Sequence, residues 1–242
     1  MKVLPIASSS KGNAYLVEQD GAAVLIDCGV SYKCLKAAFD CSRVCGVLIT
    51  HNHVDHVSGL KRLLSVLNVP VYANAMTAEA VAWQEKIDED AFICFENGQS
   101  FDLGPFTISP FSIPHDAADP VGYLIRGELT YFHGTDIGTP LDSVGLKLAE
   151  AEIATLESNH DSVMLHTSRR PPPLIQRIAG PRGHLSNEDA CELVRRFASP
   201  RLKKLFLAHL SGECNQPSLA LEAMKKTLTE KGLLNVELEI AG

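Results

Sequence analysis

The sequence lacks any long apolar run. Its uninterrupted apolar stretches are short, as in Ala22 to Ile26, whereas a bilayer span needs roughly twenty such residues. The N-terminus has Lys2 and an apolar stretch interrupted by Pro5, which is not the pattern of a secretory signal peptide. We therefore expect a soluble protein with no membrane partner.

Paired cysteines are also absent. The seven cysteines are odd in number, irregularly spaced and without a CxxC pair, which indicates reduced thiols and a cytoplasmic location. A chain of 242 residues buries most of its surface and needs no disulfide to hold a core. Cys34, Cys41 and Cys45 have no fourth ligand at zinc-finger spacing, which disfavours a structural zinc site.

Repeats, low-complexity tracts and linkers are missing as well. Hydrophobic residues make up 45% and charged residues 21% of the chain, which is ordinary for a globular protein. The only proline cluster is Pro171 to Pro173. We expect a single domain over residues 1–242.

The charge is unevenly distributed. The net charge is −7, which by itself argues against a polyanionic partner. From Ser162 to Lys204, however, nine basic residues stand against three acidic ones, a local charge of +6. Either these are solvated helix faces or they lie near a site that binds an anion.

Periodicity predicts strands first and then alternating helices and strands. The expected strands are Lys2–Ala7, Asn13–Glu18, Ala22–Asp27, Gly46–His51, Phe106–Pro114, Val121–Arg126, Leu129–Thr135, Lys204–Ala208 and Asn235–Ile240. The expected helices are Val57–Leu67, Met76–Lys86, Ser143–Ala151, Asn187–Ala198 and Ser218–Lys231. Each half opens with strands, which predicts an α/β protein with two stacked sheets and helices on their outer faces.

The string Thr50-His51-Asn52-His53-Val54-Asp55-His56 is the most informative motif. It lies between an expected strand and an expected helix. In extended backbone His51 and His53 face the same side and can share one metal ion. Asp55 and His56 follow the turn of the chain, so they can face a second ion.

Two ions need more ligands than one loop supplies. Isolated Asp and His residues stand at the ends of other expected strands: Asp27, His115, Asp136 and His209. Taken singly, each would be read as a solvated or capping residue. Their shared placement at strand ends favours a common metal site.

These residues, in this order, resemble the five-motif signature of the metallo-β-lactamase superfamily. Further strings are similar to its YycJ (WalJ)-like exonuclease branch: Ser8 to Asn13, Pro114 to Ala117, Glu157 to Asp161, Gly183 to Asn187 and Ala208 to Ser211. The resemblance covers nearly the whole chain and implies an αββα sandwich of two mixed β-sheets. His133, before Gly134, and the featureless stretch Ala151 to Leu156 depart from the pattern, but neither is a ligand position.

The resemblance also implies a ligand set for two divalent metal ions. One ion would take His51, His53 and His115, the other would take Asp55, His56 and His209, and Asp136 would bridge them. Such a pair lowers the pKa of a shared water molecule towards neutrality, so that a hydroxide is available as nucleophile. Zn²⁺ suits so many imidazoles best, and Mn²⁺ or Fe²⁺ also fits ligands without a thiolate.

Four residues are candidates for catalysis beside or within this ligand set: Asp27, Asp55, His160 and His184. Asp27 would accept the spare N–H of a ligand histidine. His184 lies 25 residues before His209, and a histidine upstream of the last ligand is the general acid in related phosphodiesterases. His160 is the rival acid, and a location beside a helix N-cap is the alternative for His184.

Substrate contacts are less sharply indicated. The turn from Ser8 to Asn13 either presents backbone N–H groups to a phosphate or is a plain hairpin turn. Arg177 and Arg182 are candidates to clamp phosphate oxygens. The residues expected to contact substrate are Ser10, Lys11, Asn13, Asn159, Arg177 and Arg182.

Phosphodiester hydrolysis is the function these features favour. The zinc β-lactamases usually have cysteine where Asp136 stands, the glyoxalase II family adds a C-terminal helical region, and the transfer-RNA processing relatives add a long arm. The +6 segment fits a nucleic-acid substrate, and the YycJ-like resemblance implies a DNA exonuclease acting from 5′ ends. The alternatives are hydrolysis of a small phosphodiester or thiolester metabolite, or a metal-binding sensor without turnover. The sequence does not indicate an oligomeric state.

Overall fold

The computed structural model describes residues 1–242, which divide into two compact units. The N-terminal unit consists of Met1–Ser112, Ala117–Glu128 and Gly242. The C-terminal unit consists of Ile113–Asp116 and Leu129–Ala241. The expectation of one domain over the whole chain stays a prediction, and each unit is described in turn.

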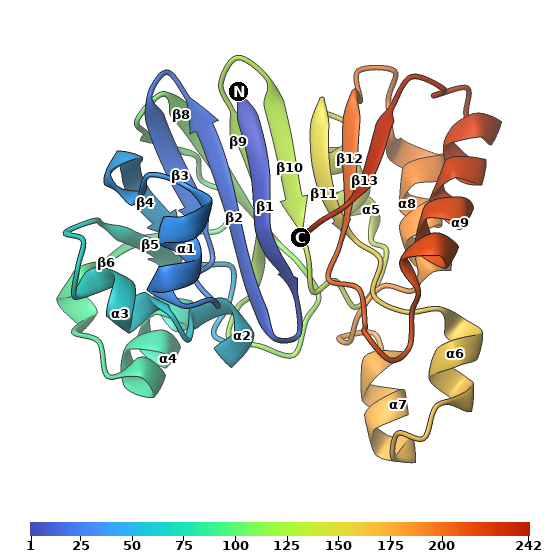
Figure 1. Ribbon diagram of the computed structural model, residues 1–242, viewed down its shortest axis with the longest axis horizontal. Helices are drawn as coiled ribbons and strands as arrows, with labels where there is room; N and C mark the ends of the chain where they lie inside the picture. The colour runs from blue at the N-terminus through green and yellow to red at the C-terminus, as the bar shows by residue number, and fades with distance from the viewer. The chain divides into compact units, whose positions relative to one another are not determined.

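The N-terminal unit contains a six-stranded mixed sheet whose strands follow one another in chain order (Figure 1). The strands are β1 (Lys2–Ser9), β2 (Gly12–Gln19), β3 (Ala22–Ile26), β4 (Val44–Leu48), β5 (Val71–Asn74) and β6 (Phe92–Phe95). The first three are antiparallel, and β3 to β6 are parallel. Because β3 and β4 are parallel, their carboxyl ends lie at the same edge of the sheet.

Helices cover one face of this sheet. They are α1 (Tyr32–Ala38), α2 (Val54–Val57), α3 (Leu60–Leu64) and α4 (Ala75–Glu85), with short 3₁₀ turns at Cys41–Arg43 and Glu89–Ala91. Leu35 of α1, Leu63 of α3 and Val81 of α4 pack in one buried cluster with Leu25 and Val47 of the sheet. Alternate strand residues point to this face, since successive side chains in a strand face opposite sides.

An antiparallel meander in the same unit supplies aromatic contacts. Its strands are β7 (Phe101–Leu103), β8 (Phe106–Ser112) and β9 (Val121–Arg126). Phe101 stacks on Tyr72 of β5, with ring centroids 5.1 Å apart. The hydroxyl of Tyr123 in β9 donates to the Ile49 carbonyl at 2.6 Å. These contacts hold the chain immediately before the His51 motif.

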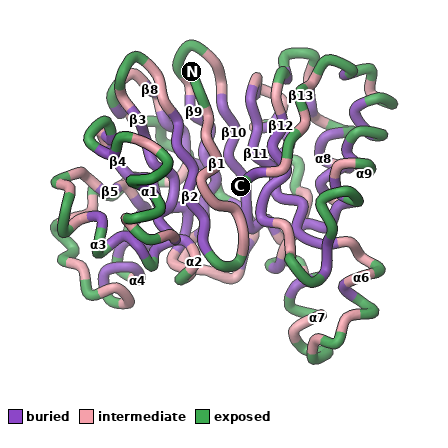
Figure 2. Tube along the Cα trace, in the orientation of Figure 1, coloured by how far each residue is buried: buried purple, intermediate pink, exposed green.

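The C-terminal unit contains four parallel strands. They are β10 (Thr130–Gly134), β11 (Ile153–Glu157), β12 (Lys204–Ala208) and β13 (Glu237–Ile240), paired in that order. Strands β10 to β12 are buried along most of their length (Figure 2). Parallel pairing brings the residues that follow β10 and β12, and the last residue of β11, to one edge of the sheet.

Five helices belong to this unit: α5 (Asp142–Leu148), α6 (Ser162–Thr167), α7 (Pro172–Ile178), α8 (Asn187–Phe197) and α9 (Pro217–Glu230). A capping box starts α8, in which Ser186 and Asp189 satisfy each other's backbone N–H groups. Leu193 and Val194 of α8 are buried, as is Met224 of α9. No helix of the protein combines the length and apolar character needed to cross a membrane.

Most of the long elements agree with the sequence-based expectation. The bounds of β9 and β12 are as predicted. The helix expected over Val57–Leu67 is wrong as one element, because α2 and α3 are separate short helices on either side of Gly59. Helix α1 and strands β5, β6 and β7 are not among the expected elements; all four are short, and α1, β6 and β7 are also partly exposed.

Candidate metal centre

The N-terminal unit gathers its candidate ligands at the carboxyl edge of β3 and β4. Asp27 follows β3, and its backbone N–H donates to the Leu48 carbonyl at 2.8 Å. Asp27 has a φ of 58°, a left-handed conformation that is uncommon for a residue other than glycine. Such backbone strain concentrates at functional sites, where the surrounding contacts must hold it.

Asp27 is fully buried, and its carboxylate holds two neighbours. It accepts hydrogen bonds from the Thr50 backbone N–H at 2.9 Å and from the Thr50 hydroxyl at 2.8 Å. It also accepts from His56 Nδ1 at 2.7 Å. Because Nδ1 of His56 therefore carries the proton, Nε2 has the lone pair that a metal ion needs. The hydrogen bond expected of Asp27 is present, and its role beside a metal ion stays a prediction.

The histidines of the motif lie close together. The ring centroids of His51 and His53 are 4.6 Å apart, and those of His51 and His56 are 4.1 Å apart. The Thr50 hydroxyl, which donates to Asp27, lies 3.0 Å from His51 Nδ1 and can accept its proton. His51 and His56 are buried, whereas His53 and Asp55 are partly exposed.

Asn13 has a different place from the one expected. Its side chain is fully buried, and Nδ2 lies 3.0 Å from both Asp55 Oδ2 and His56 Nε2. Nδ2 also donates to the Ser9 carbonyl at 3.0 Å, and Oδ1 accepts from the Ser9 N–H at 3.1 Å. The amide therefore positions the Asp55–His56 pair and is itself shielded from solvent.

Gly29 makes this arrangement sterically feasible. A Cβ at this position would lie 1.6 Å from the Asp55 carbonyl oxygen, which is far inside the contact distance. The N–H of Gly29 donates to the Asn13 carbonyl at 2.9 Å, and that of Cys28 donates to the His56 carbonyl at 2.7 Å. Only glycine permits this close approach of the backbone that follows Asp27 to α2.

The C-terminal unit forms a second cluster at the carboxyl edge of β10, β11 and β12. Asp136 follows β10, Glu157 ends β11 and His209 follows β12. Asp136 and His209 have φ values of 58° and 55°. Ligand-type atoms of Asp136, Glu157, His184 and His209 all lie within 4.8 Å of one another.

Glu157 anchors this cluster. Its Oε1 accepts from His184 Nδ1 at 2.9 Å and from His209 Nδ1 at 3.0 Å. Its Oε2 accepts from the backbone N–H groups of Ile137 at 2.7 Å and Leu185 at 3.1 Å. Four donors use the whole acceptor capacity of one carboxylate. Glu157 is thus suited to positioning histidines and not to binding a metal ion itself.

Glu157 and His184 shift each other's pKa. Burial alone would raise the pKa of the Glu157 carboxyl, but the charge of His184 and the hydrogen bonds from His184 and His209 lower that pKa to about 2. For His184, burial lowers the pKa, but the negative charge of Glu157, its hydrogen bond and the charge of Asp136 together outweigh burial, so the pKa lies above its ordinary value. The pair therefore favours a carboxylate beside an imidazolium.

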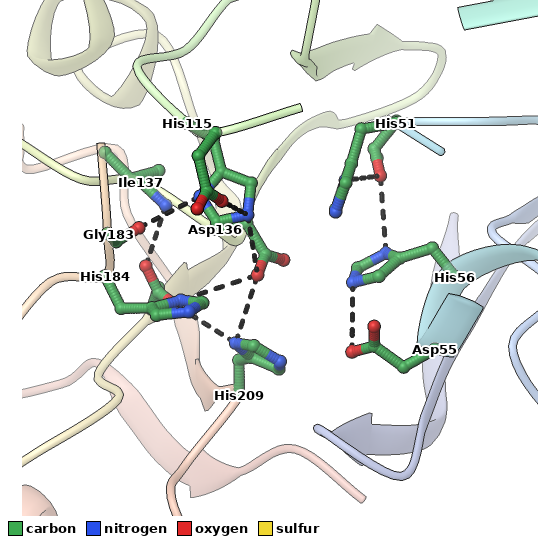
Figure 3. A network of polar contacts seen from close by, with 12 residues as sticks. His51, Asp55, His56, His115, Asp136, Ile137, Gly183, His184 and His209 are labelled. Atoms are coloured by element: carbon green, nitrogen blue, oxygen red, sulfur yellow. Dashed lines mark hydrogen bonds and ion pairs between the residues drawn. The ribbon is translucent and has the colours of Figure 1, made fainter. Parts of the chain in front are cut away.

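Asp136 lies at the centre of the histidines of this unit. Its Oδ1 is 3.4 Å from His209 Nδ1, 3.5 Å from His184 Nδ1 and 3.8 Å from His115 Nε2. Figure 3 shows His115, His184 and His209 arranged around this carboxylate. A carboxylate surrounded by imidazoles is a donor set that suits Zn²⁺ and related divalent ions.

His115 is held from two sides. Its Nδ1 donates to the Gly183 carbonyl at 3.0 Å, which leaves Nε2 as the ligand atom. Its own carbonyl accepts two hydrogen bonds from the Arg182 guanidinium, at 2.9 and 2.8 Å. Arg182, expected to clamp a phosphate, therefore supports the backbone of a candidate ligand.

The two candidate acids differ in their surroundings. The His184 side chain is 21% exposed and lies beside Asp136. His160 is buried, its Nδ1 has no hydrogen-bond partner, and burial lowers its pKa. Asn159 next to it donates to the His209 carbonyl at 2.7 Å, so this expected substrate contact also supports a candidate ligand.

The remaining expected substrate contacts lie at the surface. Ser10 and Lys11 are exposed in the turn between β1 and β2. Arg177 is also largely exposed, and its Nε donates to Asp116 Oδ2 at 2.5 Å. Arg177 is thus tied to the residue directly after His115.

Sequence reasoning missed two polar residues of these clusters. Glu157 was noticed only as part of a string, and Thr50 only as the first letter of the histidine motif. The available signal was the same as for Asp136: a polar residue where a buried strand ends. Both contact histidines. Glu157 reaches its histidines across 27 and 52 positions of sequence, and Thr50 joins the neighbouring His51 to Asp27, 23 positions away. Spacing does not reveal such long-range contacts.

Comparison with known proteins gives consistent matches. The family model described as "Beta-lactamase superfamily domain" matches residues 22–209. Exodeoxyribonuclease YycJ of Bacillus anthracis is 34% identical, over 94% of this chain and 89% of that protein. Exodeoxyribonuclease WalJ of Streptococcus pneumoniae is 32% identical, over 94% and 88%. The crystal structure of the metallo-β-lactamase fold protein YhfI from Bacillus subtilis superposes with a TM-score of 0.75, 19% identity and coverage of 99% and 95%.

Proposed function

The chain belongs to the metallo-β-lactamase superfamily, and we propose that it is a metal-dependent nuclease that removes nucleotides from DNA. The observation that carries the proposal is the likeness over 94% of the chain to proteins named exodeoxyribonucleases, at 32% and 34% identity. The two clusters of buried histidines and carboxylates support it. Family membership and the YhfI superposition also confirm the expected fold class.

The chemistry of the donor atoms fits divalent metal ions. His56, His115 and His209 each have Nδ1 engaged, by Asp27, the Gly183 carbonyl and Glu157 respectively. A histidine fixed in this way offers Nε2 to a metal. We propose Zn²⁺ as the natural ion, with Mn²⁺ or Fe²⁺ as substitutes, because the donors are imidazoles and carboxylates without a thiolate.

The proposal assigns two ions to seven ligands. The assignment rests on the order of the ligands in the chain and on the family likeness. His51, His53 and His115 would hold one ion, Asp55, His56 and His209 the other, and Asp136 both. Bound ions of this kind would neutralise phosphate charge and lower the pKa of a water molecule.

His184 is the proposed general acid. Cleavage of a phosphodiester expels an alkoxide, which leaves more easily when a positioned group donates a proton to it. His184 is partly open to solvent, lies 3.5 Å from Asp136 and is oriented by Glu157 at 2.9 Å. His160 is buried, and its Nδ1 has no hydrogen-bond partner to orient the ring. These observations favour His184 over His160.

The acid is tested by varying the leaving group. We expect His184→Ala to slow cleavage of substrates with poor leaving groups far more than cleavage of an aryl phosphodiester, whose leaving group needs no proton. General acid catalysis is worth roughly 10²–10⁴-fold, which sets the size of the difference. His160→Ala provides the matched comparison. Equal rates of wild type and His184→Ala on both substrates would remove His184 from the mechanism.

DNA cleavage is tested with end-labelled strands. Purified protein, loaded with Zn²⁺ or Mn²⁺, is incubated with single- and double-stranded DNA labelled at either end, and with a small aryl phosphodiester. We expect stepwise removal of nucleotides from the 5′ end. Hydrolysis of the small substrate with no cleavage of DNA would contradict the nuclease proposal. Metal binding without any turnover would favour a sensor.

We further propose that the protein works in the reducing cytosol. All seven cysteines are free thiols. Cys28 lies directly after Asp27, and burial, with the negative charge of Asp27, raises its pKa to about 12. A thiol held protonated is a poor metal ligand. Cys28 therefore does not compete with the imidazole and carboxylate donors for a metal ion.

A further inference from the structure

Three segments of the N-terminal unit meet beside its candidate ligands: the turn between β1 and β2, the loop from β3 into α1, and the start of α3. In the loop, the Cys28 carbonyl accepts from the Gly59 N–H at 2.8 Å, and a Cβ at Gly59 would lie 1.9 Å from the Val30 carbonyl oxygen. A Cβ at Gly12, next to the turn, would lie 2.5 Å from the Gly29 carbonyl oxygen. The turn and α3 are thus both in close contact with the loop that precedes α1.

The charged side chains of these segments are all positive. Residues 10–12, 31–38 and 58–66 contain no acidic residue and five basic ones, which we call the basic rim: Lys11, Lys33, Lys36, Lys61 and Arg62. All five are exposed, and Figure 2 shows α1 and the turn between β1 and β2 largely exposed. The four lysine side chains make no ion pair or hydrogen bond, and Arg62 donates only to the Ser65 hydroxyl at 3.2 Å. A local charge of +5 is therefore available to an anion, in a chain whose net charge is −7.

The basic residues of the C-terminal unit differ, because most of them already have a partner. Of the nine between Ser162 and Lys204, seven contact a carboxylate or a carbonyl: Arg170, Arg177, Arg182, Arg195, Arg196, Lys203 and Lys204. Each of these seven would have to give up that contact to hold a phosphate. The +6 segment found in the sequence therefore offers less free positive charge than the basic rim does.

The basic rim adjoins the candidate ligands of its own unit. Helix α2, which contains Asp55 and His56, directly precedes α3. Next to the turn, Asn13 Nδ2 lies 3.0 Å from Asp55 Oδ2, and the loop into α1 begins at Asp27. DNA carries a phosphate about every 3.4 Å along each strand. A strand with one phosphate at these ligands therefore has further phosphates beside the basic rim.

We propose that the basic rim binds the phosphate backbone of the DNA beside the bond that is cleaved. This inference rests on the proposed nuclease function and names the surface that holds its substrate. A lysine ammonium is a compact point charge, and its contacts with phosphates fix the position of the DNA without reading its sequence. Such contacts suit an enzyme that removes one nucleotide after another, because it meets every sequence in turn.

The test reverses one charge on each helix, in Lys33→Glu, Lys61→Glu and the double variant. Lys2→Glu is the matched control, because Lys2 is an exposed lysine at the opposite end of β1 from the turn. Melting temperatures check folding, and Lys33→Ala with Lys61→Ala replaces the glutamate pair if that pair is unstable. Affinity of the metal-loaded protein for a labelled DNA duplex is measured by fluorescence anisotropy, with phosphorothioate linkages that slow cleavage. KM and kcat are then measured on ordinary DNA.

We expect Lys33→Glu and Lys61→Glu each to weaken DNA binding about tenfold, and the double variant about a hundredfold, since effects at separate contacts add. Lys33→Ala should lower the slope of log affinity against log salt concentration by about 0.9, the value for one phosphate contact. The losses should be the same for two unrelated DNA sequences. KM for DNA should rise in parallel. The rate on a small aryl phosphodiester should stay at the wild-type value, as should all constants of Lys2→Glu.

The outcomes separate this inference from the function on which it rests. If wild type binds and cleaves DNA and the double variant equals it, the basic-rim proposal is overturned and the nuclease proposal stands. An equal loss in Lys2→Glu also overturns it, because net charge would then explain the effect. Losses that differ between the two sequences would overturn it as well, since the contacts would then be with bases. If wild type neither binds nor cleaves DNA, both proposals fail.

Discussion

Glu157 accepts a hydrogen bond from His209 Nδ1 at 3.0 Å, in a carboxylate that is fully buried. The same relationship occurs in the N-terminal unit, where Asp27 accepts from His56 Nδ1 at 2.7 Å. Each unit therefore contains a carboxylate that fixes the tautomer of a candidate ligand. Such partners raise the basicity of the ligand nitrogen and hold the ring in place.

Replacing Glu157 tests the first of these pairs. We expect Glu157→Gln to lower metal affinity and DNA cleavage by roughly 10–100-fold, which is the usual cost of removing the partner of a ligand histidine. The amide has only one acceptor oxygen, and its N–H₂ faces groups that are themselves donors. Metal affinity is measured by competition with a chelator. Wild-type affinity in this variant would show that Glu157 does not position His209.

Replacing Asp27 tests the second pair. Asp27→Asn should weaken metal binding by a similar factor, roughly 10–100-fold, because His56 loses its anionic partner. Asp20→Asn is a matched control, since Asp20 also has a positive φ, of 51°, but is exposed in a turn. We expect the control to bind metal as wild type does. If both variants lost metal affinity equally, the loss would not be due to the contact between Asp27 and His56, and the prediction would be wrong.

Replacing Gly29 should lower the stability of the protein. A Cβ at this position would lie 1.6 Å from the Asp55 carbonyl oxygen, so Gly29→Ala must displace α2 or the loop after β3. We expect a loss of roughly 2–4 kcal/mol in the free energy of unfolding, measured by urea denaturation of the metal-free protein. Gly212→Ala is the control, because a Cβ there would contact nothing within 4 Å. A Gly29→Ala protein as stable as the control would contradict the described packing.

We expect the buried His160 to cause part of the pH dependence of the protein's stability. Burial lowers its pKa in the folded state, so below the ordinary histidine pKa the unfolded chain binds a proton that the folded chain does not. Stability is therefore lost as the pH falls from about 6.5 towards the lower folded pKa. His160→Gln should remove this share of the loss, which is seen by comparing the melting temperatures of both proteins across that range. Parallel curves would contradict the prediction.

The sequence predicted the outline of the fold where the pattern was strong. Strands β9 and β12 end as expected because apolar runs there give way abruptly to polar or glycine-containing loops. Strands β5, β6 and β7 have only three or four residues. Such short segments carry no periodicity, so their pairing depends on contacts that the chain makes elsewhere.

The candidate ligands could be predicted from strand ends, but their supporting partners could not. Asp136 and His209 are visible because a polar residue follows an apolar run. Glu157 also stands at a strand end, but it accepts four hydrogen bonds and so supports the ligands. Asn13 and Arg182, expected at the substrate, instead contact Asp55, His56 and the His115 carbonyl. Spacing indicates which residue types gather, whereas the direction of each side chain is decided by packing.

The most direct test of the account is metal analysis of the purified protein together with DNA cleavage by the same sample. The account predicts two divalent ions per chain, loss of cleavage when a chelator removes them, and recovery on adding Zn²⁺ or Mn²⁺. His53→Ala and His209→Ala, one from each cluster, should each lose bound metal and cleavage together. Undiminished DNA cleavage by the metal-free protein would contradict the central claim.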